Sequence, residues 1–185
     1  MVKPPAHHED SDANAVARLV QGDLAALGPL YERYGGDVRS LLLRTEPRLG
    51  REGAEDLCQE VFLTFVDTLG RYRHEDKLRS WLYGIAVRKA RSWRRGRWIR
   101  VVLGQKHGAA VSGVSITTDR TEERIAAKHR IEAALQQLPD TQREVVVLRM
   151  IEGLSGEETA RILGISENAV GTRLHRARTQ LEATT

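Results

Sequence analysis

The side chains with the clearest chemical capacity in this sequence lie near its C-terminus, where cations and short polar groups share one stretch. Between residues 167 and 178, Val170, Leu174 and Ala177 are spaced by four and three, which marks the inward face of a helix. The outward face is polar and basic: Asn168, Thr172, Arg173, His175, Arg176 and Arg178. Arginine binds guanine edges and phosphates, and Thr and Asn make shorter contacts, so the pattern predicts a helix that reads DNA.

The residues before this helix predict a partner helix and a tight turn. Ser155 stands three residues before Glu158, which is the spacing of a capping box at a helix start. Ala160 is small enough for two helices to cross closely, Gly164 suits a turn of positive φ, and Ser166 can cap the second helix. The alternative is an ordinary helical hairpin with a solvated charged face. The caps, the glycine and the basic face together favour a DNA-binding helix-turn-helix.

Upstream of this helix-turn-helix (residues 155–178), a second basic stretch combines cations with tryptophans. No acid interrupts the run Arg88, Lys89, Arg91, Arg94, Arg95, Arg97 and Arg100. Trp81, Trp93 and Trp98 lie within or beside it. Cations that follow phosphates and flat rings that stack on bases hold single-stranded DNA, so the segment predicts contact with unpaired bases. The alternative places Trp81 in the core and the arginines on a solvated helix end.

Catalytic chemistry finds little support in the sequence. The run His7, His8, Glu9 and Asp10 offers metal-ligand types, but it lies in a terminal segment that we expect to be disordered. The chain has no phosphate-binding loop, no nucleophile motif and no His-Glu-x-x-His ligand pair. We therefore expect no enzymatic activity, no cofactor and no metal.

The lone cysteine and the absence of targeting signals bound the cellular context. Cys58 cannot form an intramolecular disulfide or build a zinc site unaided. Beside Leu57 and Val61 it is expected to be a small buried hydrophobe, with a redox-sensing thiol as the alternative. The N-terminus has no secretory signal, and no apolar run approaches the roughly 20 residues that span a bilayer. The formal net charge is a mild +4. We expect a cytoplasmic chain that is not itself a membrane protein.

The hydrophobic pattern predicts two clusters of helices. In the first cluster, helices are expected over residues 15–22, 23–43, 52–69 and 80–93. The third of these has Leu57, Val61, Phe65 and Leu69 at every fourth position, which is typical of one buried face. Pro29 suits the first turn of the second helix.

The second cluster follows a segment of different composition. Residues 101–118 are rich in Gly, Ser, Ala, Val and Thr without a helical period, so they predict a linker, with a pair of strands as the alternative. Helices are then expected over 125–138 and 141–152, ahead of the helix-turn-helix. Asp140 is expected to cap the helix at 141, and Gly153 to end it. The valines at 145–147 are expected to be helical despite their strand propensity.

Three stretches, taken in order, resemble the extracytoplasmic-function (ECF) sigma factors of the sigma-70 superfamily. Residues 54–62 (AEDLCQEVF) resemble region 2.2, residues 78–86 (LRSWLYGIA) resemble region 2.3, and residues 138–181 resemble region 4.2. The resemblance implies an all-α fold with two small helical domains, sigma-2 and sigma-4, joined by a flexible linker. The expected boundaries are a disordered tail at 1–13, sigma-2 at 14–99, the linker at 100–121 and sigma-4 at 122–183.

The same resemblance implies a protein that binds core RNA polymerase, recognises the −10 and −35 promoter elements and helps to open the duplex. Asp56, Gln59 and Glu60 occupy the positions that dock on the polymerase β′ clamp, and the β flap is a further contact. The helix at 167–178 would read the −35 element. The −10 element and the melting duplex would contact Arg73, His74, Lys77, Arg79, Trp81, Arg88, Lys89, Arg91, Trp93, Arg94 and Arg95.

An anti-sigma factor is a further partner that the resemblance implies. The sequence departs from the family pattern at Leu78, where an aromatic is common, at Arg88, where asparagine is common, and at Gly171, where a basic residue is frequent. The alternative function is a conventional helix-turn-helix regulator that never joins polymerase. Such regulators usually dimerise to read two half-sites, and the sequence shows no heptad or extended apolar seam.

Overall fold

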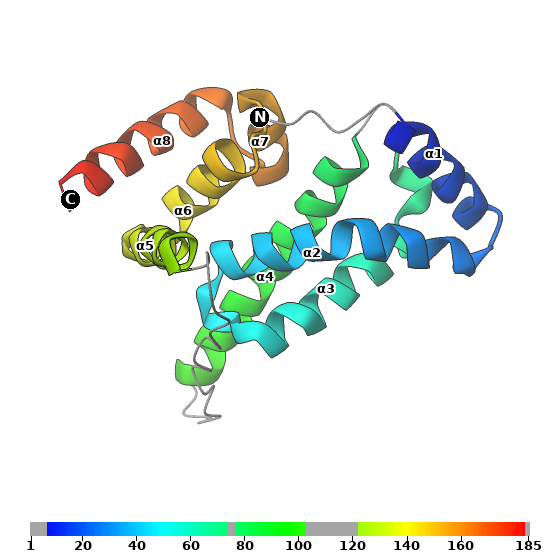
Figure 1. The fold of residues 1–185 in the computed structure, drawn as a ribbon, viewed down its shortest axis with the longest axis horizontal. Coiled ribbons are helices and arrows are strands. Elements are labelled where there is room, and N and C mark those ends of the chain that lie inside the picture. Colours follow the sequence, from blue (N-terminus) through cyan, green and yellow to red (C-terminus); the bar gives the residue numbers. More distant parts are fainter. Residues whose placement is uncertain (1–6, 74–76, 103–121, 184–185) are drawn as a thin grey trace.

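The computed structural model describes residues 7–73, 77–102 and 122–183, and every regular element in these ranges is a helix. The predicted all-α class is confirmed. The first set comprises α1 (His7–Val20), α2 (Leu27–Thr45), α3 (Gly50–Asp67) and α4 (Leu78–Val102), with the short turns η1 (Leu24–Ala26), η2 (Pro47–Leu49) and η3 (Leu69–Arg71). The second comprises α5 (Glu122–Gln137), α6 (Asp140–Val146), the π-helical turn η4 (Val147–Ile151), α7 (Gly156–Leu163) and α8 (Glu167–Glu182). Figure 1 shows α5, α6 and α8 at the opposite end of the molecule from α1, with α7 nearer the middle.

Helices α2, α3 and α4 pack around a common apolar core. The every-fourth spacing on α3 has the predicted effect, because Leu57, Val61 and Phe65 are all buried. Leu82 of α4 is fully buried against them. Leu69 departs from the prediction: α3 ends at Asp67, so this residue lies in η3, only partly buried.

The N-terminal helix is longer than predicted. A disordered tail was expected over residues 1–13, but α1 begins at His7, and this expectation is wrong for residues 7–13. Asp12 provides the physical reason, because its carboxylate is buried and accepts hydrogen bonds from Arg33 and Tyr34 of α2. A charged group in a polar sequence therefore anchors the segment. Residues 1–6 lie outside the described ranges.

The valine-rich segment of the second set is helical, as predicted. Residues 145 and 146 complete α6, and Val147 begins η4. The Glu152 N–H donates to the Val147 carbonyl at 2.9 Å, the wider spacing of a π turn. Gly153 then takes a left-handed φ of 72°, which ends the helix. The predicted helix end at Gly153 is confirmed.

Asp140 does not cap the helix as predicted. Pro139 occupies the cap position, Asp140 is the first helical residue, and no side-chain capping bond forms. Its carboxylate instead accepts from Arg143 at 3.0 Å and pairs with Arg94 of α4 at 3.3 Å. Arg48 also pairs with it at 3.4 Å, so three arginines replace the backbone N–H groups as partners of this side chain.

The expected linker begins later than predicted. Helix α4 continues to Val102, so residues 100–102 are helical, whereas the linker was expected to start at residue 100. Residues 103–121, which hold the rest of the expected linker and its alternative strand pair, lie outside the described ranges.

The two sets of helices lie against each other. Helix α7 contacts α4 and α6 contacts α2, and the buried apolar side chains form one continuous cluster across both sets. Polar contacts cross the same boundary. Arg143 of α6 donates to the Thr45 carbonyl of α2 at 3.3 Å, and Arg91 of α4 donates to the Leu163 carbonyl of α7 at 3.1 Å. The structure is therefore a closed arrangement of the two sets.

Candidate nucleic-acid interface

Helix α8 presents the polar and basic face that the sequence predicts. Val170 and Ala177 are buried, and Leu174 packs partly buried against the same core. Among the predicted DNA contacts, Arg173 is partly buried and the others are exposed: Asn168, Thr172, His175, Arg176 and Arg178. A Cβ added at Gly171 would meet nothing within 4 Å, so this face is open at that point. The arrangement fits a helix that enters a DNA major groove.

The residues that the sequence singles out build the start of α7 and the turn between α7 and α8. Ser155 accepts from the Glu158 N–H at 3.0 Å, and the Glu158 carboxylate accepts from the Ser155 N–H at 2.8 Å, which completes the predicted capping box. Gly164 takes φ 67°, and Ser166 accepts from the Ala169 N–H at 3.2 Å. Gly164 and Ser166 lie between the two helices and set the direction in which α8 leaves the turn.

Replacing Ser155 with alanine is expected to lower the free energy of unfolding by about 1 kcal/mol, because the Glu158 N–H loses its acceptor. With a urea m-value of about 2 kcal/mol per molar, the unfolding midpoint should fall by about 0.5 M. Circular dichroism during a urea titration measures this change. Ser155→Asp keeps an acceptor and should retain most of the stability. An equal loss in both variants would contradict the capping role.

The basic side chains of α4 and its approach are mostly occupied in the closed arrangement. Five of those predicted to contact the −10 element form ion pairs: Lys77 with Glu158, Arg79 with Glu152, Lys89 with Glu60, Arg91 with Glu144, and Arg94 with Glu144 and Asp140. The exposed cations Arg73, Arg88 and Arg95 make no ion pair with another described residue. His74 lies outside the described ranges. The predicted site is therefore split between paired and open cations.

The tryptophans of α4 differ in exposure. Trp81 is partly buried and meets Tyr72 edge to face at 5.7 Å, so both the core and the surface alternatives apply to it in part. Trp93 is partly buried below the Arg97 guanidinium, which lies 5.6 Å from the ring centroid. Trp98 is 67% exposed. An exposed ring beside arginines is suited to stacking on a base.

The predicted polymerase contacts share the outer face of α3. Asp56, Gln59 and Glu60 are all exposed. Glu60 also accepts from Lys89 of α4 at 3.0 Å, so it joins the predicted polymerase face to the predicted DNA face.

Leu63 is a candidate that the sequence analysis missed. Its side chain is 61% exposed, although it lies in the middle of a well-packed helix. The sequence spacing could have identified Leu63, because it follows Asp56 by two helical turns and so lies on the same outer face. A single exposed leucine is common on protein surfaces, so it is the position of Leu63 on the face of Asp56, Gln59 and Glu60 that makes it a candidate contact.

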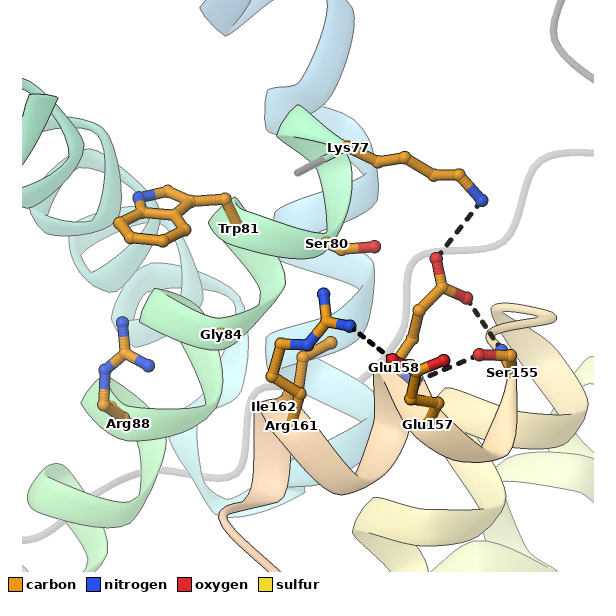
Figure 2. Close-up of a pocket in the computed structure, with 10 residues that line it drawn as sticks. All are labelled: Lys77, Ser80, Trp81, Gly84, Arg88, Ser155, Glu157, Glu158, Arg161 and Ile162. Atoms are coloured by element: carbon orange, nitrogen blue, oxygen red, sulfur yellow. Dashed lines mark hydrogen bonds and ion pairs between the residues drawn. The ribbon is translucent and has the colours of Figure 1, made fainter. Parts of the chain in front are cut away.

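A cleft of about 460 Å³ lies between α4 and α7, beside the place where the two helices contact each other. Figure 2 shows Ser80, Trp81, Gly84 and Arg88 on the α4 side, and Lys77 reaching across to Glu158, with which it pairs at 3.2 Å. The α7 side consists of Ser155, Glu157, Glu158, Arg161 and Ile162. The cleft therefore lies between the predicted −10 contacts and the first helix of the helix-turn-helix.

The remaining chemical candidates are inert or absent from the described ranges. Cys58 is fully buried, and burial raises the pKa of its thiol, which disfavours the reactive thiolate. Its neighbourhood therefore supports the structural interpretation over the redox one. Among residues 7–73, 77–102 and 122–183, no three His, Cys, Asp or Glu side chains gather as a metal site would require. No helix in those ranges is long and apolar enough to cross a membrane.

The fold and these faces define a two-domain helical protein of the helix-turn-helix class. Two family models match the chain in order: sigma-70 region 2 over residues 30–99, and sigma-70 region 4 over residues 128–181. The ECF RNA polymerase sigma factor SigM of Mycobacterium tuberculosis is 31% identical over 175 residues, covering 94% of this chain and 84% of that protein. The RNA polymerase sigma factor CnrH of Cupriavidus metallidurans is 30% identical over 182 residues, covering 95% and 94%. The chain belongs to the ECF sigma factors of the sigma-70 family.

Solved structures agree with this family. CnrH in complex with the cytosolic domain of CnrY superimposes with a TM-score of 0.63 at 27% identity, covering 94% of this chain and 96% of that one. The sigma factor RpoE in complex with the anti-sigma factor NepR from Bartonella quintana has the same TM-score at 21% identity, covering 84% and 94%, and so shares the fold. The predicted two-domain sigma architecture is confirmed.

Proposed function

We propose that this chain directs core RNA polymerase to promoters, with a separate exposed face for each task. The outer face of α3 binds polymerase, α8 reads the −35 element, and α4 with the residues before it binds the −10 element and the opening duplex. The observation that supports this most strongly is that both sigma-70 regions match in order, region 4 on the helix-turn-helix and region 2 on the helices before it. The expected boundaries, sigma-2 at 14–99 and sigma-4 at 122–183, then correspond to functional units.

The chain itself supplies no catalysis in this proposal. The polymerase makes the bonds, while the sigma factor contributes recognition and strand separation. Flipping a base out of the stack costs a few kcal/mol, which ring stacking and phosphate contacts must offset. Trp81, Trp93 and the open cations Arg73, Arg88 and Arg95 supply groups of both kinds. This work takes place in the cytoplasm, where polymerase and DNA are.

Run-off transcription over a library of promoter fragments tests the proposal and reads out the promoter sequence. The chain with bacterial core polymerase should give defined transcripts, and core polymerase alone should give none at the same fragments. Specific duplex binding without any association with core polymerase would instead indicate a conventional helix-turn-helix regulator.

Leu63 extends the proposed polymerase face. Replacing it with alanine is expected to weaken binding to core polymerase about tenfold, because a leucine that becomes buried in a contact contributes about 1.5–3 kcal/mol at full burial. A fluorescence titration of labelled chain with core polymerase measures this. Leu24→Ala is a matched control, since Leu24 is equally exposed, at 64%, but lies in η1. Equal effects of the two substitutions would remove Leu63 from the face.

An anti-sigma factor remains the second proposed protein partner. The structural relative CnrH is seen in complex with the cytosolic domain of CnrY, and RpoE is seen in complex with the anti-sigma factor NepR. A partner of this kind would have to cover one or both of the DNA-binding faces described above.

A further inference from the structure

A pocket of about 420 Å³ lies at the C-terminal end of α4, and we call it the arginine pocket. Its lining residues come from η2, from the last turns of α4 and from the first position of α6: Arg48, Arg94, Arg95, Arg97, Trp98 and Asp140. None of them lines the cleft beside Trp81. Trp98 follows Trp81 by 17 residues, which is about 25 Å along a helix. The arginine pocket is therefore separate from that cleft.

Two of the four arginines in the pocket are paired with carboxylates of the chain. Arg48 lies 2.5 Å from Glu46 and 3.4 Å from Asp140. Arg94 lies 3.3 Å from Asp140. Asp140 is the one carboxylate among the lining residues, and Arg143 is its third partner at 3.0 Å. Because three guanidinium groups surround it, the charge of Asp140 is compensated and repels an incoming anion only weakly.

The other two arginines of the pocket have no such compensation. Arg95 is exposed and Arg97 is partly buried, and neither makes an ion pair with another described residue. The Arg97 guanidinium is stacked over Trp93, 5.6 Å from the ring centroid. A guanidinium held on a ring in this way keeps the N–H donors at its edge available to an anion. The pocket therefore has an excess of positive charge, in a form that suits phosphate oxygens.

Trp98 gives the pocket a flat apolar surface. Its side chain is 67% exposed, whereas Trp81 and Trp93 pack partly buried against the core. An aromatic side chain can stack on any base, because every base has a flat π face. A ring beside unpaired arginines therefore matches a molecule that has both a base and phosphates. The volume of the pocket is within the range of sites that take one small ligand, about 300–1,000 Å³.

We propose that the arginine pocket binds a free nucleotide with two or more phosphates, whose base stacks on Trp98 and whose phosphate oxygens accept hydrogen bonds from Arg95 and Arg97. Two cations without counter-charge require more than one negative charge, which is why a polyphosphate fits better than a monophosphate. The proposed polymerase face on α3 and the proposed −35 face on α8 contribute no residue to this pocket. Arg97 and Trp98 are not among the proposed −10 contacts, so these two residues provide the test.

Binding of ATP that carries a fluorescent N-methylanthraniloyl group on its ribose tests this proposal on the full chain. Fluorescence anisotropy should show saturable binding, and unlabelled ATP should displace the probe. Trp98→Ala should weaken binding about tenfold through lost stacking, and Trp98→Phe, which keeps a flat ring, should retain most of the affinity. Arg97→Ala should also weaken it about tenfold, because charge-assisted hydrogen bonds are lost. Arg130→Ala/Ile131→Ala is the matched control, since it removes an exposed arginine and an adjacent exposed apolar side chain from α5.

Each outcome either supports the nucleotide site or overturns it. Saturable binding that both alanine variants weaken, and that the control and Trp98→Phe largely keep, supports it, provided that circular dichroism finds the same helix content. No saturable binding at millimolar ATP overturns it. Displacement by inorganic tripolyphosphate as effective as that by ATP also overturns it, because the ring would then take no part.

Two further ligands distinguish the other molecules that could supply phosphates. If affinity for a mixed-sequence single strand of DNA falls as much as ATP affinity in Arg97→Ala and Trp98→Ala, the pocket belongs to the path of the strand and the free-nucleotide site is overturned. Sedimentation with phosphatidylglycerol vesicles that Trp98→Ala abolishes, without binding of ATP, would identify a lipid surface instead. Neither result affects the proposed sigma function, which run-off transcription tests separately.

Discussion

Exchanging both Asp56 and Glu60 for lysine is expected to weaken binding to core RNA polymerase about a hundredfold, since each reversal replaces an attraction by a repulsion and tenfold corresponds to about 1.4 kcal/mol. Both carboxylates are exposed on the outer face of α3, so the substitutions should leave the core of the first domain intact. Complementary charge governs the rate of encounter as well as the final contact, so the association rate constant should fall at low salt.

Binding of labelled chain to core polymerase at several salt concentrations measures this effect. Glu32→Lys/Glu182→Lys is the matched control, because it changes the net charge equally at exposed positions outside the α3 face. Glu60 also pairs with Lys89, and Glu60→Gln separates the loss of that pair from the reversal of charge. If the control lowers polymerase affinity as much as the test variant does, net charge and not the α3 face determines binding.

The parts of the fold that the sequence predicts correctly are those where one local signal decides the structure. Leu57, Val61 and Phe65 share a helical face whatever else the chain does, and all three are buried. The capping box at Ser155 and the left-handed Gly164 depend on residues within a few positions. Local chemistry of this kind is present in the sequence before any tertiary contact forms.

The predictions that fail depend on a distant partner. Asp12 makes residues 7–13 helical through Arg33 and Tyr34 on another helix, which no local pattern reveals. Asp140 has the type and position of a cap, but Arg94, far along the sequence, competes for its carboxylate. In each case an ion pair between helices outweighs a local preference.

The closed arrangement of the two sets of helices could not be predicted from the sequence either, because it also depends on partners that are distant in the chain. The basic run of α4 is compatible with DNA, with solvent or with carboxylates, and composition does not distinguish among them. Glu144 is the one sequence feature that points to this contact, because it directly precedes three buried valines. A glutamate at such a buried position requires a cation, but the sequence does not show that Arg91 and Arg94 supply it.

Replacing Arg173 and Arg176 with alanine is expected to weaken binding to the −35 duplex about a hundredfold, at about 1–3 kcal/mol for each arginine that contacts a guanine edge. Arg176 is exposed and Arg173 partly buried on the outer face of α8, while Val170 and Ala177 hold the helix from its other side. Polymerase affinity should be unchanged, because the proposed polymerase face lies on α3.

Titrations with promoter duplexes identified by run-off transcription distinguish the two ways in which these arginines can act. A base contact would relax specificity at one position, whereas a phosphate contact would weaken all sequences alike and reduce the slope of log affinity against log salt by about 1 per arginine. Arg18→Ala/Arg130→Ala is the control of equal charge, since both side chains are exposed outside α8. If this control weakens the duplex complex as much as the α8 variant, or if the α8 variant binds normally, then α8 is not the recognition helix. Gly171→Lys is the complementary substitution. The surface at Gly171 has room for this side chain, which would restore the cation that the family frequently has at this position.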